Sequence, residues 1–257
     1  MSESRQWPLD GGAPPKGSLA WVVGVGAIQG TGGAIVRRLA DAGMKVVVTG
    51  RTPEKVDAIV RDVTDRGGVA IAAPADAGTD EGLQPALDIV RREGGLHTAI
   101  YNAGGSQWRP NPLEMDTKFF EDVWRTNCLG SFIVAREATR LMLERNGGVL
   151  LFTGSISGVI GRPKLTAYAS AKFGQRAIAQ AFAREYGPKN IHVANIIVHG
   201  PIDGDRLNNA FPHAKDKRPE DGMVNIDSIA ETFWQVLTQP RHAWTHEMDI
   251  RPYCEPF

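Results

Sequence analysis

A tyrosine and a lysine four residues apart are the residues of this chain best suited to proton chemistry. Tyr168 and Lys172 lie in an alanine-rich segment, so in a helix both side chains emerge on one face. An ammonium group beside a phenol favours the phenolate, which lowers the pKa of Tyr168 from its reference value of about 10 toward neutrality. The pair therefore predicts general acid–base catalysis, although the same spacing also occurs on ordinary helix surfaces.

A serine is expected at the edge of the sheet where ligands bind. Ser155 lies 13 residues before Tyr168 and follows the apolar run 149–152. That run is typical of a strand buried in a parallel sheet, which places Ser155 at the carboxyl end of the strand. Open α/β sheets bind their ligands at this edge.

The composition indicates one large α/β domain. The chain has 257 residues, of which 42% are hydrophobic and 23% charged, so it can bury a core without metal or disulfide. Its 29 basic and 29 acidic residues leave no positive excess for nucleic acid. Cys128 and Cys254 are the only cysteines and fit a reducing compartment. No signal peptide and no apolar run of the ~20 residues that a bilayer requires is present, which predicts a cytoplasmic protein without a membrane partner.

The chain divides into a short arm and one domain. Residues 1–17 are polar and rich in proline and glycine, which predicts a flexible N-terminal arm. Residues 18–257 are predicted to form a single dinucleotide-binding catalytic domain, with a substrate lid at about 201–225.

A glycine-rich turn opens this domain. Residues 19–25 are a predicted strand, a helical pattern follows the turn, and a second strand at 45–49 completes a βαβ unit. Backbone amides at a helix start can bind a phosphate, and residues without a Cβ let a pyrophosphate come close. The cofactor-binding residues predicted here are Gly26, Gln29, Gly30, Thr31 and Gly32.

An arginine at the end of the second strand favours NADP. Folds that prefer NAD usually place an acidic residue about 20 residues beyond the glycines, whereas a nearby arginine accommodates the 2′-phosphate of NADP. Gly50 stands at the place of the acid and Arg51 follows it. NADP is therefore the predicted cofactor, with NAD as the alternative.

The alternation of strands and helices continues along the chain. Asp76 follows the third strand, where it could accept a hydrogen bond from the adenine amine or cap a helix. Asn102, Ala103 and Gly104 follow the fourth strand, where small residues allow a cofactor ribose to approach. The predicted fold class is a doubly wound α/β, Rossmann-type three-layer sandwich with a mostly parallel seven-stranded sheet. The further predicted strands are 68–73, 97–101, 192–198 and 244–250, and the further predicted helices are 53–65, 79–93, 117–145, 168–186 and 226–237.

Taken in order, these motifs resemble the single-domain branch of the short-chain dehydrogenase/reductase family. The resemblance rests on the glycine turn from Gly26 to Gly32, Asn102-Ala103-Gly104, Asn127, Ser155 and the Tyr168-x-x-x-Lys172 pair, and it extends from about residue 19 to the last strand. It implies that a hydride passes between nicotinamide and a carbonyl or alcohol substrate, without a metal. It also implies a homo-oligomer, a dimer or tetramer, formed through the two long helices and the last helix and strand.

The resemblance assigns roles to four catalytic residues. Tyr168 would be the acid/base, Ser155 would orient the substrate carbonyl, and Lys172 would bind the nicotinamide ribose and lower the pKa of Tyr168. Asn127 would hold a water that links Lys172 to solvent. Gly200 and Ile202, after the sixth strand, would border the cofactor.

The substrate side is less defined by the sequence. The family usually has Pro-Gly after the sixth strand, whereas this chain has His199-Gly200. His199 is therefore a candidate substrate contact or second titrating group, or else a bystander that donates to a backbone carbonyl. Gln107, Trp108 and Ser157 are the other predicted substrate contacts. Two alternatives stay open: an enoyl or imine reductase of the same fold, and a nucleotide-sensing protein without turnover.

Overall fold

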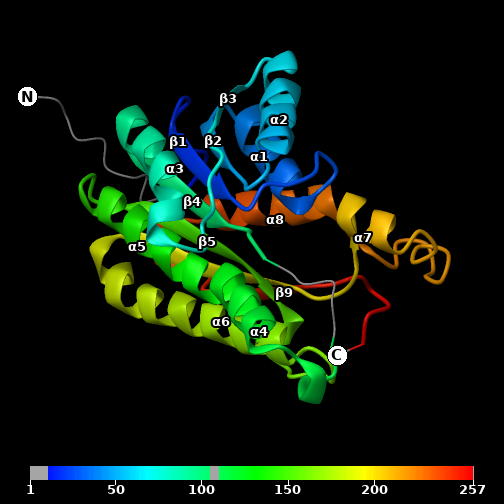
Figure 1. Cartoon of the computed structure of the whole chain (residues 1–257). Helices are drawn as coiled ribbons and strands as arrows, with labels where there is room; N and C mark the ends of the chain where they lie inside the picture. Colours follow the sequence, from blue (N-terminus) through cyan, green and yellow to red (C-terminus); the bar gives the residue numbers. More distant parts are fainter. Residues whose placement is uncertain (1–10, 105–109, 257) are drawn as a thin grey trace, which may run out of the picture.

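The computed structural model of the protein describes residues 11–104 and 110–256. Seven strands form one sheet in the order β3-β2-β1-β4-β5-β6-β9, and every pairing in it is parallel (Figure 1). The predicted doubly wound fold class is confirmed. The strand order reverses between β1 and β4, so the switch point where such sheets bind ligands lies at the carboxyl ends of these two strands.

The elements have the following bounds. The strands of the sheet are β1 (Leu19–Val23), β2 (Lys45–Thr49), β3 (Val69–Ala72), β4 (Leu96–Tyr101), β5 (Gly148–Ser155), β6 (Ile191–Val198) and β9 (Glu247–Ile250). The helices are α1 (Thr31–Asp41), α2 (Pro53–Asp65), α3 (Asp80–Glu93), α4 (Thr117–Trp124), α5 (Gly130–Leu143), α6 (Thr166–Tyr186), α7 (Asp205–Ala210) and α8 (Ile226–Leu237).

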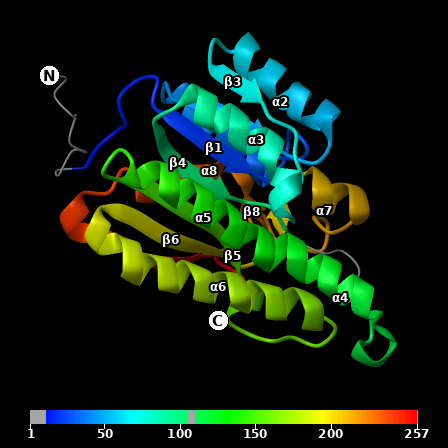
Figure 2. The same cartoon turned by 60° about the vertical axis from the view of Figure 1, so that its left-hand side comes forward.

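Helices cover both faces of the sheet because its strands are apolar on both sides. β1, β4 and β6 are buried at every residue. Their alternate side chains pack into two cores, one under α1, α2 and α8 and the other under α3, α5 and α6. Figure 2 shows the second helix layer, α3, α5 and α6, in front of the sheet. Burial on both faces is what a parallel sheet requires.

A buried tryptophan ties the first two strands together. Trp21 of β1 is fully buried, and its indole Nε1 donates to Thr49 Oγ1 of β2 at 2.9 Å. A buried indole N–H needs such a partner. The bond fixes the two strand ends beside which the glycine turn begins.

The structure corrects several predicted boundaries. The first strand ends at Val23 instead of residue 25, because Gly24 adopts φ +96° and the chain turns there. The predicted helix 117–145 is interrupted by a π-helical segment, Arg125–Leu129, between α4 and α5. The last strand begins at Glu247 instead of residue 244, after a 3-10 turn at Arg241–Ala243.

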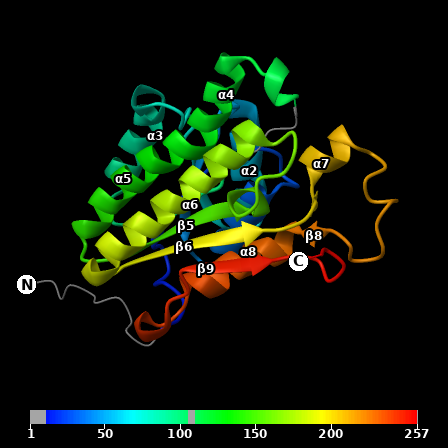
Figure 3. The same cartoon turned by 90° about the horizontal axis from the view of Figure 1, so that it is seen from below.

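The segment predicted as a lid leaves the sheet after β6. It contains α7 and a two-stranded parallel sheet of β7 (Ile202–Asp203) and β8 (Val224–Asn225). Figure 3 shows β6 and β9 pointing toward α7. The lid residues therefore lie at the carboxyl edge of the sheet, where the candidate site is.

The predicted N-terminal arm falls partly outside the described residues. Residues 1–10 lie outside them, whereas the amide of Gly12 donates to the carbonyl of Thr238 at 2.9 Å and Pro14 is buried. The end of this segment thus packs on the carboxyl end of α8. No helix in the described part of the chain is long and apolar enough to cross a membrane.

Candidate active site

The glycine turn brings the start of α1 against β4. Asn102, just after β4, donates from Nδ2 to the carbonyl of Gly24 at 2.9 Å. A Cβ on Gly32 would lie 3.0 Å from Asn102 Nδ2, and one on Gly33 would lie 2.4 Å from the carbonyl oxygen of Ile28. These two positions need glycine because the turn, the helix and the strand end are in contact.

The same turn has the features that an anionic cofactor group needs. Gly30 caps α1 without a side-chain hydrogen bond, and the first turn of α1 has no acidic residue. A Cβ at Gly26 would meet no described atom within 4 Å, so packing inside the protein does not require glycine there. Uncapped amides at a helix start favour a phosphate group, so the residues present fit a dinucleotide.

A chain of hydrogen bonds links this turn to the predicted catalytic lysine. Thr153 of β5 donates from Oγ1 to Asn102 Oδ1 at 2.9 Å. Its carbonyl oxygen accepts from Lys172 Nζ at 3.0 Å and from Gln175 Nε2 at 3.1 Å. Lys172 Nζ also donates to Gln175 Oε1 at 2.7 Å. These hydrogen bonds join the glycine turn to α6. They run through Thr153 and Gln175, which the sequence alone did not indicate as site residues.

Tyr168 and Lys172 share one face of α6, as their spacing predicts. Lys172 Nζ lies 5.9 Å from the centre of the Tyr168 ring. Tyr168 is half-buried in the first turn of the helix, whereas Lys172 is buried at 4% exposure. The phenol can therefore reach a ligand while the ammonium stays behind it.

Ser155 is held at the end of β5 by a short 3-10 turn. Its Oγ accepts a hydrogen bond from the amide of Ser157 at 3.2 Å, which caps the turn Ile156–Gly158. A Cβ on Gly158 would lie 2.9 Å from the carbonyl oxygen of Lys172. The absence of a side chain at Gly158 lets this turn pack directly on α6, which brings Ser155 to the helix that carries Tyr168.

Asn127 lies in the π-helical segment between α4 and α5. It is buried at 1% exposure and donates from Nδ2 to the carbonyl of Val123 at 2.8 Å. A Cβ on Gly104 would lie 2.4 Å from Asn127 Oδ1 and 3.3 Å from Lys172 Nζ. The structure therefore brings Asn127 Oδ1 and Lys172 Nζ close to the same side of Gly104, and π-helical turns of this kind are frequent at functional sites.

Burial dominates the electrostatics of the lysine. Removal from water, together with the positive charge of Arg206 on α7, lowers the pKa of Lys172 to about 7. Arg206 donates from Nη1 to the carbonyl oxygen of Gly104 at 2.7 Å, and the amide of the adjacent Asp205 donates to the carbonyl of Gln29 at 2.7 Å. The segment predicted as a lid thus contacts both the glycine turn and the loop after β4.

The other predicted cofactor residues lie around the switch point. Arg51 is exposed after β2, and its positive charge acts on the buried phenol of Tyr101 in β4, as does the negative charge of Asp76. Asp76 Oδ1 accepts from the amide of Gly78 at 3.0 Å. Gly200 has φ +137°, and a Cβ there would lie 2.9 Å from Pro252 Cδ.

The predicted substrate contacts are only partly visible. Gln107 and Trp108 lie outside the described residues. Ser157 belongs to the turn that follows Ser155 and is buried at 3% exposure. His199 is buried at 1% exposure beneath Arg162, so a direct contact of the imidazole with substrate would require neighbouring side chains to move. Both contacts stay predictions.

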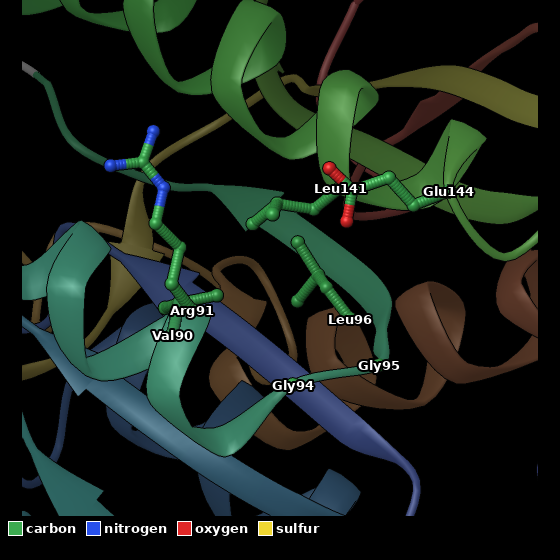
Figure 4. A pocket seen from close by; sticks show the side chains of 7 residues that line it. All are labelled: Val90, Arg91, Gly94, Gly95, Leu96, Leu141 and Glu144. Carbon is green, nitrogen blue, oxygen red and sulfur yellow. The ribbon is translucent and has the colours of Figure 1, made fainter.

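A separate hollow lies at the opposite edge of the sheet. It has a volume of about 200 Å³, and its residues include Arg91, Gly95, Leu96 and Leu141 (Figure 4). Leu96 is the first residue of β4, whereas Asn102 and Gly104 follow its last residue. This hollow therefore belongs to the amino edge and not to the candidate site. Among the described residues, no group of three or more His, Cys, Asp and Glu side chains could hold a metal.

A doubly wound sheet with a glycine turn at its switch point is the architecture of a dinucleotide-binding protein. The sequence profile of the short chain dehydrogenase family matches residues 20–215, and the chain belongs to this family. It is thus an NAD(P)-dependent dehydrogenase/reductase with a small-molecule substrate.

Relatives of known name are similar over most of the chain. The 3-oxoacyl-(acyl-carrier-protein) reductase MabA of Mycobacterium tuberculosis is 32% identical over 220 residues, which cover 84% of this chain and 81% of MabA. The 2-dehydro-3-deoxy-D-gluconate 5-dehydrogenase of Formosa agariphila is 29% identical, with 85% of this chain and 88% of that protein covered.

Solved structures agree with this assignment. A short-chain dehydrogenase from Rhodopseudomonas palustris superposes with a TM-score of 0.79 at 33% identity, covering 93% of this chain and all (100%) of that chain. A 7α-hydroxysteroid dehydrogenase complexed with NADH and 7-oxo glycochenodeoxycholic acid has a TM-score of 0.82 at 25% identity, covering 92% and 93% of the two chains.

Proposed function

We propose that the protein is an NADP-dependent oxidoreductase acting on a carbonyl/alcohol pair, with Tyr168 as its acid/base. The observation that carries the proposal is the position of Lys172. Its buried Nζ lies behind the Tyr168 ring and is joined through the carbonyl of Thr153 to β5, the strand that ends at Ser155. Nothing in the packing of a helix against a sheet requires a buried ammonium at this place, and such a group is costly unless it is used.

The chain's own residues supply the proton and the orientation. When bound, the nicotinamide ring supplies the hydride that the carbonyl carbon accepts. Tyr168 gives its hydroxyl proton to the carbonyl oxygen, so that the product is an alcohol, and the reverse steps oxidise an alcohol. Ser155 Oγ donates a hydrogen bond to the same oxygen, and the ammonium of Lys172 stabilises the negative charge left on Tyr168.

The cofactor would lie along the switch point. The uncapped first turn of α1, with Gly26, Gln29, Gly30, Thr31 and Gly32, would hold the pyrophosphate. Asn102, Ala103 and Gly104 would border the nicotinamide ribose together with Lys172, and Gly200 and Ile202 would border the nicotinamide. Asp76 would accept from the adenine amine.

Arg51 supports NADP over NAD. It is an exposed cation next to Gly50, which stands after β2 at the place where an acidic residue would bind the ribose 2′-hydroxyl of NAD. An arginine at this place binds a 2′-phosphate with charge-assisted hydrogen bonds. The relative whose solved structure contains NADH shows that the fold also accepts that cofactor.

A homo-oligomer through α4, α5 and α6 is part of the proposal. Trp124, Phe132, Leu143 and Phe173 are large apolar side chains of these helices with 36–43% exposure. Gathered on one helix layer, they suit a second copy of the chain. Light scattering coupled to size-exclusion chromatography should give the mass of a dimer or tetramer, and a monomer at micromolar concentration would contradict this part.

The proposed activity can be tested by cofactor titration and one substitution. Quenching of tryptophan fluorescence should show tighter binding of NADPH than of NADH, and a panel of ketones and aldehydes should oxidise NADPH. Tyr168→Phe should retain the dissociation constant for NADPH but lower kcat at least ~100-fold. Unchanged turnover in this variant would remove Tyr168 from the mechanism, and absence of binding of either cofactor would overturn the proposal.

A further inference from the structure

Arg162 lies on the loop that joins the two catalytic side chains. It follows Ser155 by seven residues and precedes Tyr168 by six, and it is exposed. In the described part of the chain its guanidinium has a single hydrogen-bond partner, His199, whose Nε2 lies 3.4 Å from Arg162 Nη2. No carboxylate within that same part forms an ion pair with Arg162.

The register of the sheet fixes where this guanidinium lies. Ser155 of β5 is paired with Val198 of β6, and His199 is the next residue, still bonded to the ladder through its amide to the carbonyl of Ile250 at 2.9 Å. One residue of a strand advances by about 3.3 Å. His199 therefore lies one step beyond the rung that contains Ser155, and Arg162 covers it.

His199 is held from behind by the edge strand. Its Nδ1 lies 3.7 Å from Asp249 Oδ2, and Asp249 is itself bound by both ends of the Arg251 guanidinium, at 2.9 and 2.8 Å. This arrangement favours the tautomer with the proton on Nδ1 facing Asp249 and the lone pair on Nε2 facing Arg162. The imidazole can then orient the guanidinium without neutralising it.

The local charge balance leaves a positive excess. Asp249 forms an ion pair with Arg251 at 2.8 Å, whereas no ion pair among the described residues involves Arg162. The guanidinium of Arg206 adds a second positive charge at the site, since it contacts the carbonyl of Gly104 and acts on Lys172. An anionic group of a substrate would gain stronger, charge-assisted hydrogen bonds from these guanidinium groups than a neutral group would.

We infer that Arg162 binds an anionic group of the substrate, and that the substrate class is a ketone or alcohol carrying a carboxylate. The inference rests on the proposed function and names its substrate class. The planar guanidinium can bind a carboxylate through two parallel hydrogen bonds, which fixes the orientation of the reacting carbonyl relative to Ser155 and Tyr168. His199 is a positioning residue that acts through Arg162.

Matched pairs of acid and ester test this inference. The probes are 4-oxopentanoate and 3-oxocyclohexane-1-carboxylate, each compared with its methyl ester, with NADPH as reductant. The wild-type enzyme should have at least ~10-fold higher kcat/KM for each acid than for its ester, the scale of one charge-assisted hydrogen bond. Arg162→Gln should abolish this preference through KM, with kcat for the esters unchanged. Arg61→Gln, which removes an exposed cation on α2, should leave the preference intact.

The positioning role of His199 has its own readout. His199→Gln retains a hydrogen-bond acceptor and should keep most of the acid preference, whereas His199→Leu should reduce it by raising KM for the acids. Equal reduction of acids and esters by the wild type, or a preference that survives Arg162→Gln, would overturn the inference and leave the proposed function standing. If the enzyme reduced no acid, no ester and no neutral ketone, both this inference and the proposed function would be overturned.

Discussion

Lys172 Nζ donates to Gln175 Oε1 at 2.7 Å, one turn along the same helix. Gln175 is buried at 1% exposure and anchors itself through Nε2 to the carbonyl of Thr153. The lysine therefore keeps two oxygen acceptors although it has almost no access to water. These acceptors favour the ammonium, whereas burial favours the neutral amine.

Replacement of Gln175 should shift the protonation of Lys172. Gln175→Leu removes an acceptor of the ammonium, which should lower the pKa of Lys172 below about 7 and move the alkaline limb of the kcat profile to lower pH by about one unit. Gln175→Glu should move that limb in the opposite direction, because a carboxylate favours the ammonium. Profiles of both variants that coincide with the wild type would show that Gln175 does not influence this titration.

The buried lysine should also make stability depend on pH. Its pKa is about 7 in the folded protein and returns to 10.5 on unfolding, so the unfolded chain binds more protons between these values. The free energy of unfolding therefore rises with pH through this window. From pH 7 to pH 9, wild type should gain roughly 2 kcal/mol relative to Lys172→Met, measured by urea unfolding. If the difference in unfolding free energy between wild type and Lys172→Met stayed constant with pH, the pKa of Lys172 would not be lowered in the folded protein.

Reversal of charge at Arg51 should change the cofactor preference. Arg51→Asp removes the predicted partner of the 2′-phosphate and places an acceptor for the 2′-hydroxyl, so the ratio of NADPH to NADH affinity should fall by about 10–100-fold. Arg241→Asp, an exposed arginine in the 3-10 turn before β9, is the matched control for net charge. If the ratio of NADPH to NADH affinity is the same in both variants, a residue other than Arg51 binds the 2′-phosphate.

Addition of one methyl group at Gly24, which precedes the glycine turn, should destabilise the protein. A Cβ there would lie 2.0 Å from the amide nitrogen of Ala103, and the residue has φ +96°. Gly24→Ala should lower the free energy of unfolding by about 2–4 kcal/mol, from backbone strain and overlap together. Gly67→Ala is the control, since Gly67 has φ +81° but open space around it, and it should cost only about 1 kcal/mol. Equal losses would mean that overlap with Ala103 adds nothing.

The shared helix face of Tyr168 and Lys172 and the fold class could be predicted because each depends on local periodicity. The period of a helix alone places Tyr168 and Lys172 on one face. Apolar runs that alternate with helical patterns indicate a parallel sheet, and parallel strands bring their carboxyl ends to one edge, which is where Ser155 and Asn102 lie. The boundaries that were wrong, at residues 25 and 244 and within 117–145, lie where a glycine turn, a 3-10 turn and a π-helical turn interrupt the pattern.

The sequence by itself determined which residues meet along one helix or at one sheet edge. Only the tertiary structure decided their partners. Thr153 as the acceptor of Lys172 and Gln175, and Arg162 above His199, depend on strand register and on how closely a turn packs against α6. Such contacts join residues that no local period relates, because they arise from packing between elements that are distant along the chain.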